Sequence, residues 1–147
     1  MDNSEFNLYQ IAEELPEAVH ALCSVIDYKN LDQLFGKCPI DIVIHSAAYK
    51  HVPLCEENVD IAITNNIIGT KNVIDLSIKH GVHKVVIIAT DKADRPTNVM
   101  GTTKRIGELY AQNVTSGETE LVAGRCGNVM GRSGMFAHQV QNEDETA

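Results

Sequence analysis

The chain has 147 residues, enough for one domain with a single core and too few for two. Its hydrophobic fraction of 44% is ordinary for a globular protein and argues against general disorder. The formal net charge of −8 argues against nucleic acid and anionic membrane surfaces as partners, because phosphate binding depends on clustered Lys and Arg.

The cysteines indicate a reducing compartment. Cys23, Cys38, Cys55 and Cys126 include no CxxC pair and no spacing typical of a disulfide scaffold, so we expect reduced thiols in a cytoplasmic protein. No stretch approaches the roughly 20 apolar residues that a membrane span needs. The polar, acidic N-terminus does not resemble a secretory signal. We expect no metal site.

Apolar runs alternate with amphipathic segments along the chain, a pattern typical of a parallel α/β sheet. We expect helices over residues 6–15, 31–35, 60–81 and from 96 through 110, and strands over residues 21–26, 40–46, 84–90 and 120–125. Gly81 is placed to stop the long helix, and Thr97 or Asn98 to cap the last one. Residues 42–44 and 85–88 are continuously apolar, which predicts strands covered on both faces.

One absent motif bears on the fold. A Rossmann domain begins with a strand, a glycine-rich turn and a helix, and the turn binds the pyrophosphate. The chain contains no G-x-G-x-x-G. It begins instead with Asp2 and Glu5, where the end of a second strand would carry the acidic ribose contact. We therefore expect a partial Rossmann-like, doubly wound parallel sheet without its first βα unit.

Polar residues follow the expected strand ends. Ser46 ends the expected strand at 40–46, and Ala47 and Ala48 follow it. Small residues let a backbone approach a dinucleotide, although an ordinary tight turn has the same pattern. In the long helix, a buried hydrogen-bonding role is plausible for Asn65 and Asn66, and solvent exposure explains Asn65 equally well.

The most apolar strand ends in Thr90, Asp91, Lys92 and Ala93. A hydroxyl, a carboxylate and an ammonium group together are what an elimination next to a carbonyl would use. A capped loop with a local Asp–Lys pair fits these residues equally well.

Together these segments resemble the capsular polysaccharide biosynthesis group of UDP-N-acetylglucosamine 4,6-dehydratases, in the extended short-chain dehydrogenase/reductase superfamily. The motifs AAYKHVP and TDKA carry most of the resemblance. The matching segments are residues 2–6, 47–53, 56–58, 65–70, 90–93, 96–105 and 125–131. The resemblance extends to about Gly134. We therefore expect an incomplete NAD(P)-binding domain over 1–134, a divergent, flexible tail over 135–147, and no C-terminal substrate lobe.

The resemblance implies roles for particular residues. The sugar would be oxidised at C4, Lys92 would take the C5 proton, and Asp91 would protonate the departing C6 hydroxyl. Met100 and Lys104 lie four apart on one helix face, a spacing that carries Tyr and Lys in the superfamily. Met100 cannot transfer a proton, and dehydratases with Met form a recognised subset. The implied catalytic residues are Thr90, Asp91, Lys92, Met100 and Lys104.

The resemblance also implies NAD as cofactor and a UDP-sugar as substrate, and a homo-oligomer in the intact family. NAD is favoured over NADP because a carboxylate at Asp2 accepts from a ribose 2′-hydroxyl and repels a 2′-phosphate. Ser24 departs from the Asp usual near the adenine. The implied cofactor contacts are Asp2, Ser4, Glu5, Ala47, Ala48, Tyr49, Lys50, Asn66 and Lys104, and the substrate contacts are His51 and Asn128.

Two alternatives stay open. A nucleotide-sugar epimerase belongs to the same superfamily, but it needs no acid at C6 and normally retains the Tyr. A non-catalytic fragment or interaction module is the other, because the absent central strands would leave sheet edges unpaired.

Overall fold

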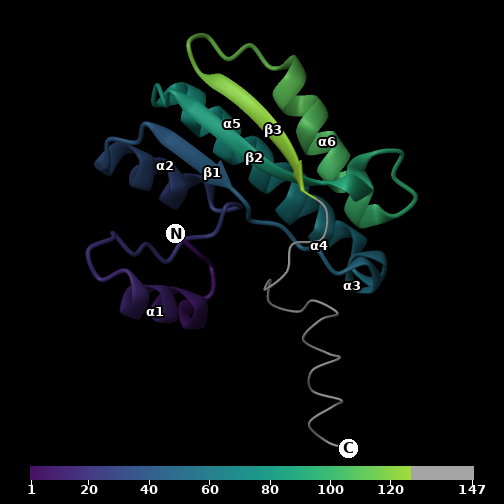
Figure 1. The fold of residues 1–147 in the computed structure, drawn as a ribbon, viewed down its shortest axis with the longest axis horizontal. Coiled ribbons are helices and arrows are strands. Elements are labelled where there is room, and N and C mark those ends of the chain that lie inside the picture. The colour runs from purple at the N-terminus through teal and green to yellow at the C-terminus, as the bar shows by residue number, and fades with distance from the viewer. Residues whose placement is uncertain (127–147) are drawn as a thin grey trace, which may run out of the picture.

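Three parallel strands form the sheet of this computed structural model, which describes residues 1–126. They are β1 (Ile42–His45), β2 (Lys84–Thr90) and β3 (Glu120–Cys126), in the order β1-β2-β3 (Figure 1). Lys84 pairs with both Ile42 and Glu120, so the three strands start level with one another. The expected α/β fold with a parallel sheet is confirmed. Asn128, the boundary at Gly134 and the tail lie outside the described residues.

Three helices cover one face of the sheet: α2 (Tyr28–Lys37), α5 (Gly69–Lys79) and α6 (Val99–Asn113). Along β2 every second side chain lies on this face and is buried. Burial of this apolar surface drives the packing of the layer. The core consists of Val25, Leu31, Phe35, Val73, Ile74, Leu76, Val82, Val85, Ile87 and Ala111.

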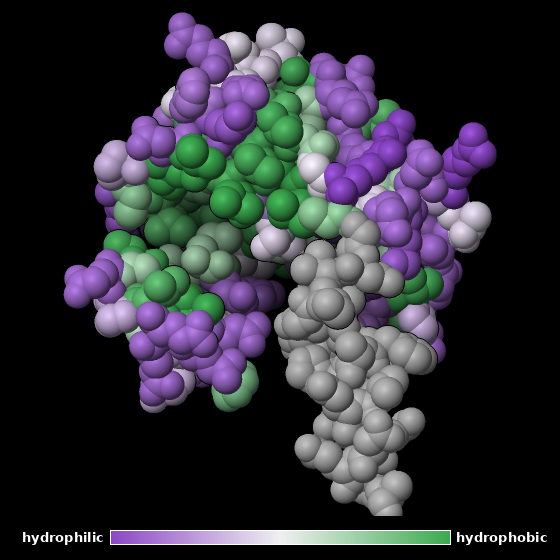
Figure 2. Space-filling view, viewed as in Figure 1, coloured by the Kyte–Doolittle hydropathy of each residue, from purple (hydrophilic) through white to green (hydrophobic). Residues whose placement is uncertain are grey.

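The other face of the sheet is uncovered by the described residues. Ile42 and Ile44 are 57% and 69% exposed, and Val122 on β3 is 36% exposed. Figure 2 shows a broad hydrophobic surface over the strands on this side. The expectation of strands covered on both faces is therefore wrong for residues 1–126. A continuous apolar run indicates that both faces of a strand are suited to burial, but it does not indicate which segment covers each face.

The expected strand at 21–26 is also absent. A single parallel bridge joins Leu22 to Asp2, and Ser4 then caps helix α1 (Glu5–Glu14). A ladder cannot extend beyond this bridge because the partner segment turns into a helix after three residues. Helix α1 itself buries no residue, and Figure 1 shows it lying apart from β1.

The expected helices at 6–15 and 31–35 are confirmed as α1 and α2, with ends shifted by up to three residues. The expected long helix is present but divided. It comprises α4 (Val59–Ile63), a π-helical turn η1 (Thr64–Ile68) and α5, and Gly81 at φ 68° follows its end. Asn98 caps α6 by accepting a hydrogen bond from the Gly101 amide at 2.8 Å. Short helices α3 (Val52–Glu57) and η2 (Asp91–Ala93), the second a 3-10 turn, follow β1 and β2.

Candidate functional site

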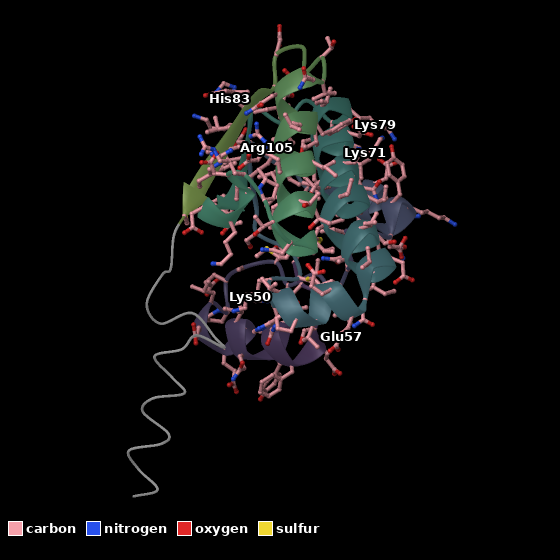
Figure 3. All side chains as sticks on the ribbon, turned by 90° about the vertical axis from the view of Figure 1, so that its right-hand side faces the viewer. Lys50, Glu57, Lys71, Lys79, His83 and Arg105 are labelled. Carbon is pink, nitrogen blue, oxygen red and sulfur yellow. The ribbon has the colours of Figure 1, made fainter. Side chains whose placement is uncertain are left out.

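The candidate site lies at the carboxyl ends of the strands. Because the sheet is parallel, the segments that leave β1 and β2 emerge at the same edge, where α/β sheets bind ligands. Figure 3 shows Lys50, which follows β1, at the opposite end of the molecule from His83, which precedes β2. No helix within residues 1–126 combines the length and the apolar character that crossing a bilayer demands.

A cavity of about 420 Å³ opens beside the end of β1. Five of the expected cofactor residues line it: Asp2, Ala47, Ala48, Tyr49 and Lys50. The cavity also includes residues that were not predicted as contacts, namely Met1, Asn3, Asn7, Cys23, Ser24, Val25, Ser46 and Asn65. The expected residues at the start of the chain and those in the segment after β1 therefore line the same cavity.

Ser4 and Glu5 do not line this cavity. The Ser4 hydroxyl accepts a hydrogen bond from the Asn7 amide and thereby caps α1, and Glu5 is the first residue of that helix. The Ser4 amide donates to Asp2 Oδ1 at 2.8 Å. Both residues therefore shape the turn that carries Asp2.

The Asn66 side chain joins the segment after β1 to helix α6, and its contacts with Tyr49 and Thr103 form the Asn66 clamp. Its side chain is 1% exposed, accepts from the Tyr49 amide at 2.8 Å and donates to the Tyr49 carbonyl at 3.1 Å. The same amide nitrogen donates to Thr103 Oγ1 on α6 at 3.0 Å. Asn66 therefore fixes the segment after β1 and joins it to the helix that carries Lys104. Asn65 is 8% exposed, so the explanation of Asn65 by solvent exposure is wrong.

The segment after β2 gathers three expected catalytic groups. Thr90 Oγ1 donates to Asp91 Oδ1 at 3.0 Å, and the Lys92 amide donates to the same carboxylate oxygen at 2.9 Å. Lys92 Nζ lies 3.9 Å from Asp91 Oδ1, and both side chains are largely solvent-accessible. The hydroxyl, carboxylate and ammonium groups are thus adjacent and open to a ligand.

The two helix residues of this site differ in their surroundings. Lys104 Nζ donates to the carbonyl of Ile88 on β2 at 3.0 Å. Met100 is 3% exposed and packs in a small apolar cluster with Cys55 and Ala62. A buried thioether among apolar groups has no proton to offer, so the position that carries Tyr elsewhere in the superfamily contributes packing in this chain.

His45 is a functional-site neighbour that the sequence analysis did not single out. It ends β1, is 4% exposed, and its Nε2 lies 2.9 Å from Thr70 Oγ1. Burial, with a smaller effect of the nearby Lys104 charge, lowers the pKa of His45 from 6.5 to about 4. The imidazole is therefore neutral at physiological pH. An apolar strand ending in His directly before small residues was the available signal.

His51, an expected substrate contact, lines a different cavity. It precedes α3 and lines a second cavity of about 190 Å³ together with Tyr49, Lys50 and Cys55. It is not among the residues that line the larger cavity. Within residues 1–126 no three His, Cys, Asp or Glu side chains are arranged to hold a metal ion, and the four cysteines are free thiols.

The larger cavity fits part of a dinucleotide. Its walls include the small side chains of Ser46, Ala47 and Ala48, which permit close approach of a ligand to the backbone. Asp2 uses one carboxylate oxygen on the Ser4 amide, and a ribose hydroxyl can donate to the other. Its volume is within the range of small-molecule sites.

Comparison with known proteins identifies the family of this chain. The family model described as "Polysaccharide biosynthesis protein" matches residues 1–146. The chain belongs to this polysaccharide biosynthesis family. Its motif-based resemblance is thereby confirmed.

Individual relatives also match the chain. The domain is 39% identical to the capsular polysaccharide biosynthesis protein CapD of Staphylococcus aureus, over 99% of this chain and 26% of that protein. It is 36% identical to a UDP-glucose 4-epimerase of Rickettsia rickettsii, over 92% of this chain and 42% of that protein. The chain thus spans well under half the length of these curated relatives.

Solved structures show the same fold. Pen from Bacillus thuringiensis is 33% identical with a TM-score of 0.89, over 98% of this chain and 48% of that one. A dTDP-4-dehydrorhamnose reductase from Bacillus anthracis, solved with NADP, is 25% identical with a TM-score of 0.73, over 84% of this chain and 48% of that one. A UDP-glucose 4-epimerase from Brucella ovis, solved with NAD, shares the fold at 23% identity and a TM-score of 0.67, over 71% and 37%.

Proposed function

We propose that this polysaccharide biosynthesis domain carries the cofactor-binding and catalytic residues of a nucleotide-sugar 4,6-dehydratase acting on UDP-N-acetylglucosamine. The observation that carries the proposal is the adjacency of Asp91 and Lys92 at the open end of β2, with 3.9 Å between carboxylate and ammonium. An elimination needs one acid and one base on neighbouring carbons, and this pair supplies both.

The residues divide the chemistry as follows. With a ketone at C4, the C5 proton is acidic, and Lys92 Nζ takes it. Asp91 gives a proton to the C6 hydroxyl, which leaves as water, and Thr90 holds the sugar by its hydroxyl. A nicotinamide cofactor, held by Lys104 and by the cavity that Asp2 and Ala47 line, would supply the hydride acceptor for C4 and the hydride donor for C6. The C4 hydroxyl proton would pass to a lysine or a water, and Lys92 would return its proton to C5.

The elimination needs Lys92 as a neutral amine and Asp91 as a carboxylic acid when the sugar nucleotide is bound. Both side chains are exposed in the free protein, so a substrate can reach them.

An epimerase remains the second candidate because the family includes a relative of that name, 36% identical over 92% of this chain. Epimerisation at C4 needs hydride removal and return on opposite faces of the same carbon, and no acid at C6. Met100 disfavours it by resemblance, because epimerases of the superfamily normally retain Tyr at this position whereas dehydratases with Met form a recognised subset. The paired Asp91 and Lys92 favour dehydration, because an acid at C6 is needed only for the loss of water.

NAD is the proposed cofactor because Asp2 lines the cavity and carries a negative charge. The 2′-phosphate of NADP would meet that charge, whereas a 2′-hydroxyl can donate to it. Calorimetry with NAD and NADP on the wild-type chain and the D2N variant tests this choice. We expect D2N to reduce the preference for NAD; an equal preference in both proteins would contradict the role of Asp2.

The activity test uses the purified chain and an extended protein in which a glycine-rich strand, turn and helix precede Met1. Each protein is incubated with NAD and UDP-N-acetylglucosamine, and the masses of the products are measured by mass spectrometry. A dehydratase yields a sugar nucleotide lighter by one water, and an epimerase yields one of unchanged mass. We expect the lighter product from the extended protein, and none from its D91N variant.

The outcomes separate the alternatives. A product of unchanged mass in every active sample would establish the epimerase and refute the dehydratase. NAD binding without turnover in both proteins would favour a non-catalytic module. The matched control is D41N, which alters an exposed aspartate directly before β1, at the opposite end of the strands from Asp91, and should leave turnover intact.

A further inference from the structure

A buried carboxylate lies one helical turn beyond Lys104. Glu108 is on α6, and its side chain is 2% exposed. It receives hydrogen bonds from two guanidinium groups: Arg125 Nε and Nη2 at 2.9 and 2.8 Å, and Arg105 Nη1 at 2.8 Å. Figure 3 labels Arg105 on this helix. These bonds lower the pKa of Glu108, so the carboxylate stays ionised.

Arg125 connects this carboxylate to the catalytic segment. It lies on β3 and pairs in register with Ala89, the residue before Thr90. Its third nitrogen, Nη1, donates to Asp94 Oδ1 at 3.4 Å. Asp94 ends the 3-10 turn that contains Asp91 and Lys92. One guanidinium therefore contacts both the helix that carries Lys104 and the end of the turn that carries the acid–base pair.

The planar guanidinium makes this connection specific. Arg125 approaches Glu108 through two nitrogens, which fixes the orientation of both groups, while the third nitrogen points to Asp94. A lysine offers the same charge from a single nitrogen and cannot hold both acids in this geometry. The pair thus determines where the turn after β2 lies relative to α6.

We propose that Arg125 and Glu108 are positioning residues that hold the Asp91–Lys92 turn against helix α6. They do not reach the reacting atoms; they act through Asp94 on one side and through the helix backbone near Lys104 on the other. The catalytic consequence rests on the proposed function. The effect on the position of the Asp91–Lys92 turn does not rest on the proposed function, because it concerns the chain without ligand.

Amide hydrogen exchange of the whole 147-residue chain tests the positional effect. The variants are R125K, E108Q and D94N, and the control is K84Q, which breaks the Lys84–Glu120 pair between the same two strands at their other end. We expect exchange in residues 90–95 to rise about two- to fivefold in D94N, the effect of losing one exposed ion pair. The β1 amides and the urea midpoint should not change, because Asp94 is exposed.

R125K and E108Q should accelerate exchange in residues 90–95 more than in β1, after correction for any change in the urea midpoint. K84Q should leave the 90–95 segment as in the wild type. Two results together would overturn the proposal: amide exchange that accelerates equally in all segments in proportion to the loss of global stability, and unchanged exchange in residues 90–95 of D94N. They would show that the Arg125–Glu108 cluster has only a structural role.

Kinetics in the extended protein give the catalytic readout. D94N is expected to lower kcat while the KM for the sugar nucleotide stays within about twofold, since positioning affects the chemical step more than uniform binding. A changed KM with unchanged kcat would contradict positioning. If the extended protein is inactive, the proposed function fails, and the exchange result alone decides the role of Arg125 and Glu108.

Discussion

Lys104 Nζ donates a hydrogen bond to the carbonyl oxygen of Ile88 at 3.0 Å, which ties helix α6 to β2 two residues before Thr90. The cation is therefore held at the strand end beside the segment that carries Asp91 and Lys92. This contact makes Lys104 part of the site's architecture as well as of its proposed chemistry.

Replacing Lys104 tests both roles. We expect K104M to weaken NAD binding by about tenfold or more, the effect of losing a hydrogen bond to a charged group. Calorimetry on the extended protein measures it. The control is K71M, which removes an exposed lysine paired with Asp75 on α5. Equal affinities in the two variants would exclude a specific cofactor contact at Lys104.

Gly101 lies against the turn that contains Lys92. A Cβ at Gly101 would overlap the carbonyl oxygen of Lys92 and lie 3.2 Å from Pro96 Cβ. G101A should therefore destabilise the chain by about 1–3 kcal/mol, as overpacking does, and displace the turn that contains Lys92. Urea unfolding measures the loss. In the matched helical variant G36A, the new methyl meets only His80 at 3.6 Å, and stability should not fall. Equal effects would show that the close approach is not limiting.

The Asn66 clamp predicts an asymmetric effect of an isosteric change. N66D keeps an acceptor for the Tyr49 amide but faces the Tyr49 carbonyl with a carboxylate in place of an amide donor. We expect a loss of at least about 1–3 kcal/mol in the free energy of unfolding, the range for a buried group left without its partner. N113D removes a similar donor from an exposed helix end and should cost far less. Similar losses in the two variants would refute the clamp.

His45 predicts a pH dependence of stability. Its pKa is about 4 in the folded chain and 6.5 in the reference state, so between these values the unfolded chain binds a proton that the folded chain does not. Its contribution is fully present above pH 6.5 and is lost as the pH falls toward 4, by up to about 3 kcal/mol. H45Q should reduce the difference in unfolding free energy between pH 7 and pH 4.5. H83Q, at an exposed position, should not. An unaltered pH dependence in H45Q would contradict the assignment.

Local chemistry explains what the sequence predicted about the fold. The cap at Asn98, the stop at Gly81 and the apolar runs at β1, β2 and β3 depend on nearby residues, and each was found close to its expected position. The strand at 21–26 failed for a non-local reason. Its apolar residues are suited to a sheet, but a strand exists only with a partner, and residue 2 supplies a single bridge.

The candidate site was predictable where residues follow strand ends, as at Ala47 and Asp91. Contacts made across the fold were not. Asn66 meets Tyr49 and Thr103 over separations of 17 and 37 residues, and no periodic pattern encodes those partners. Arg125 was recognised only as part of a motif, because its bond to Glu108 depends on the register of β3 against β2.

The π-helical turn at Thr64–Ile68 makes the long helix sensitive to its exact length. A π turn contains one residue more than an α turn would, and each residue rotates an α-helix by about 100°. Deleting a single residue there would let the helix become uniform. It would also rotate α4, with Ala62 beneath Met100, by roughly a third of a turn relative to the core face of α5. A one-codon deletion there would therefore separate the Met100 cluster from the Asn66 clamp.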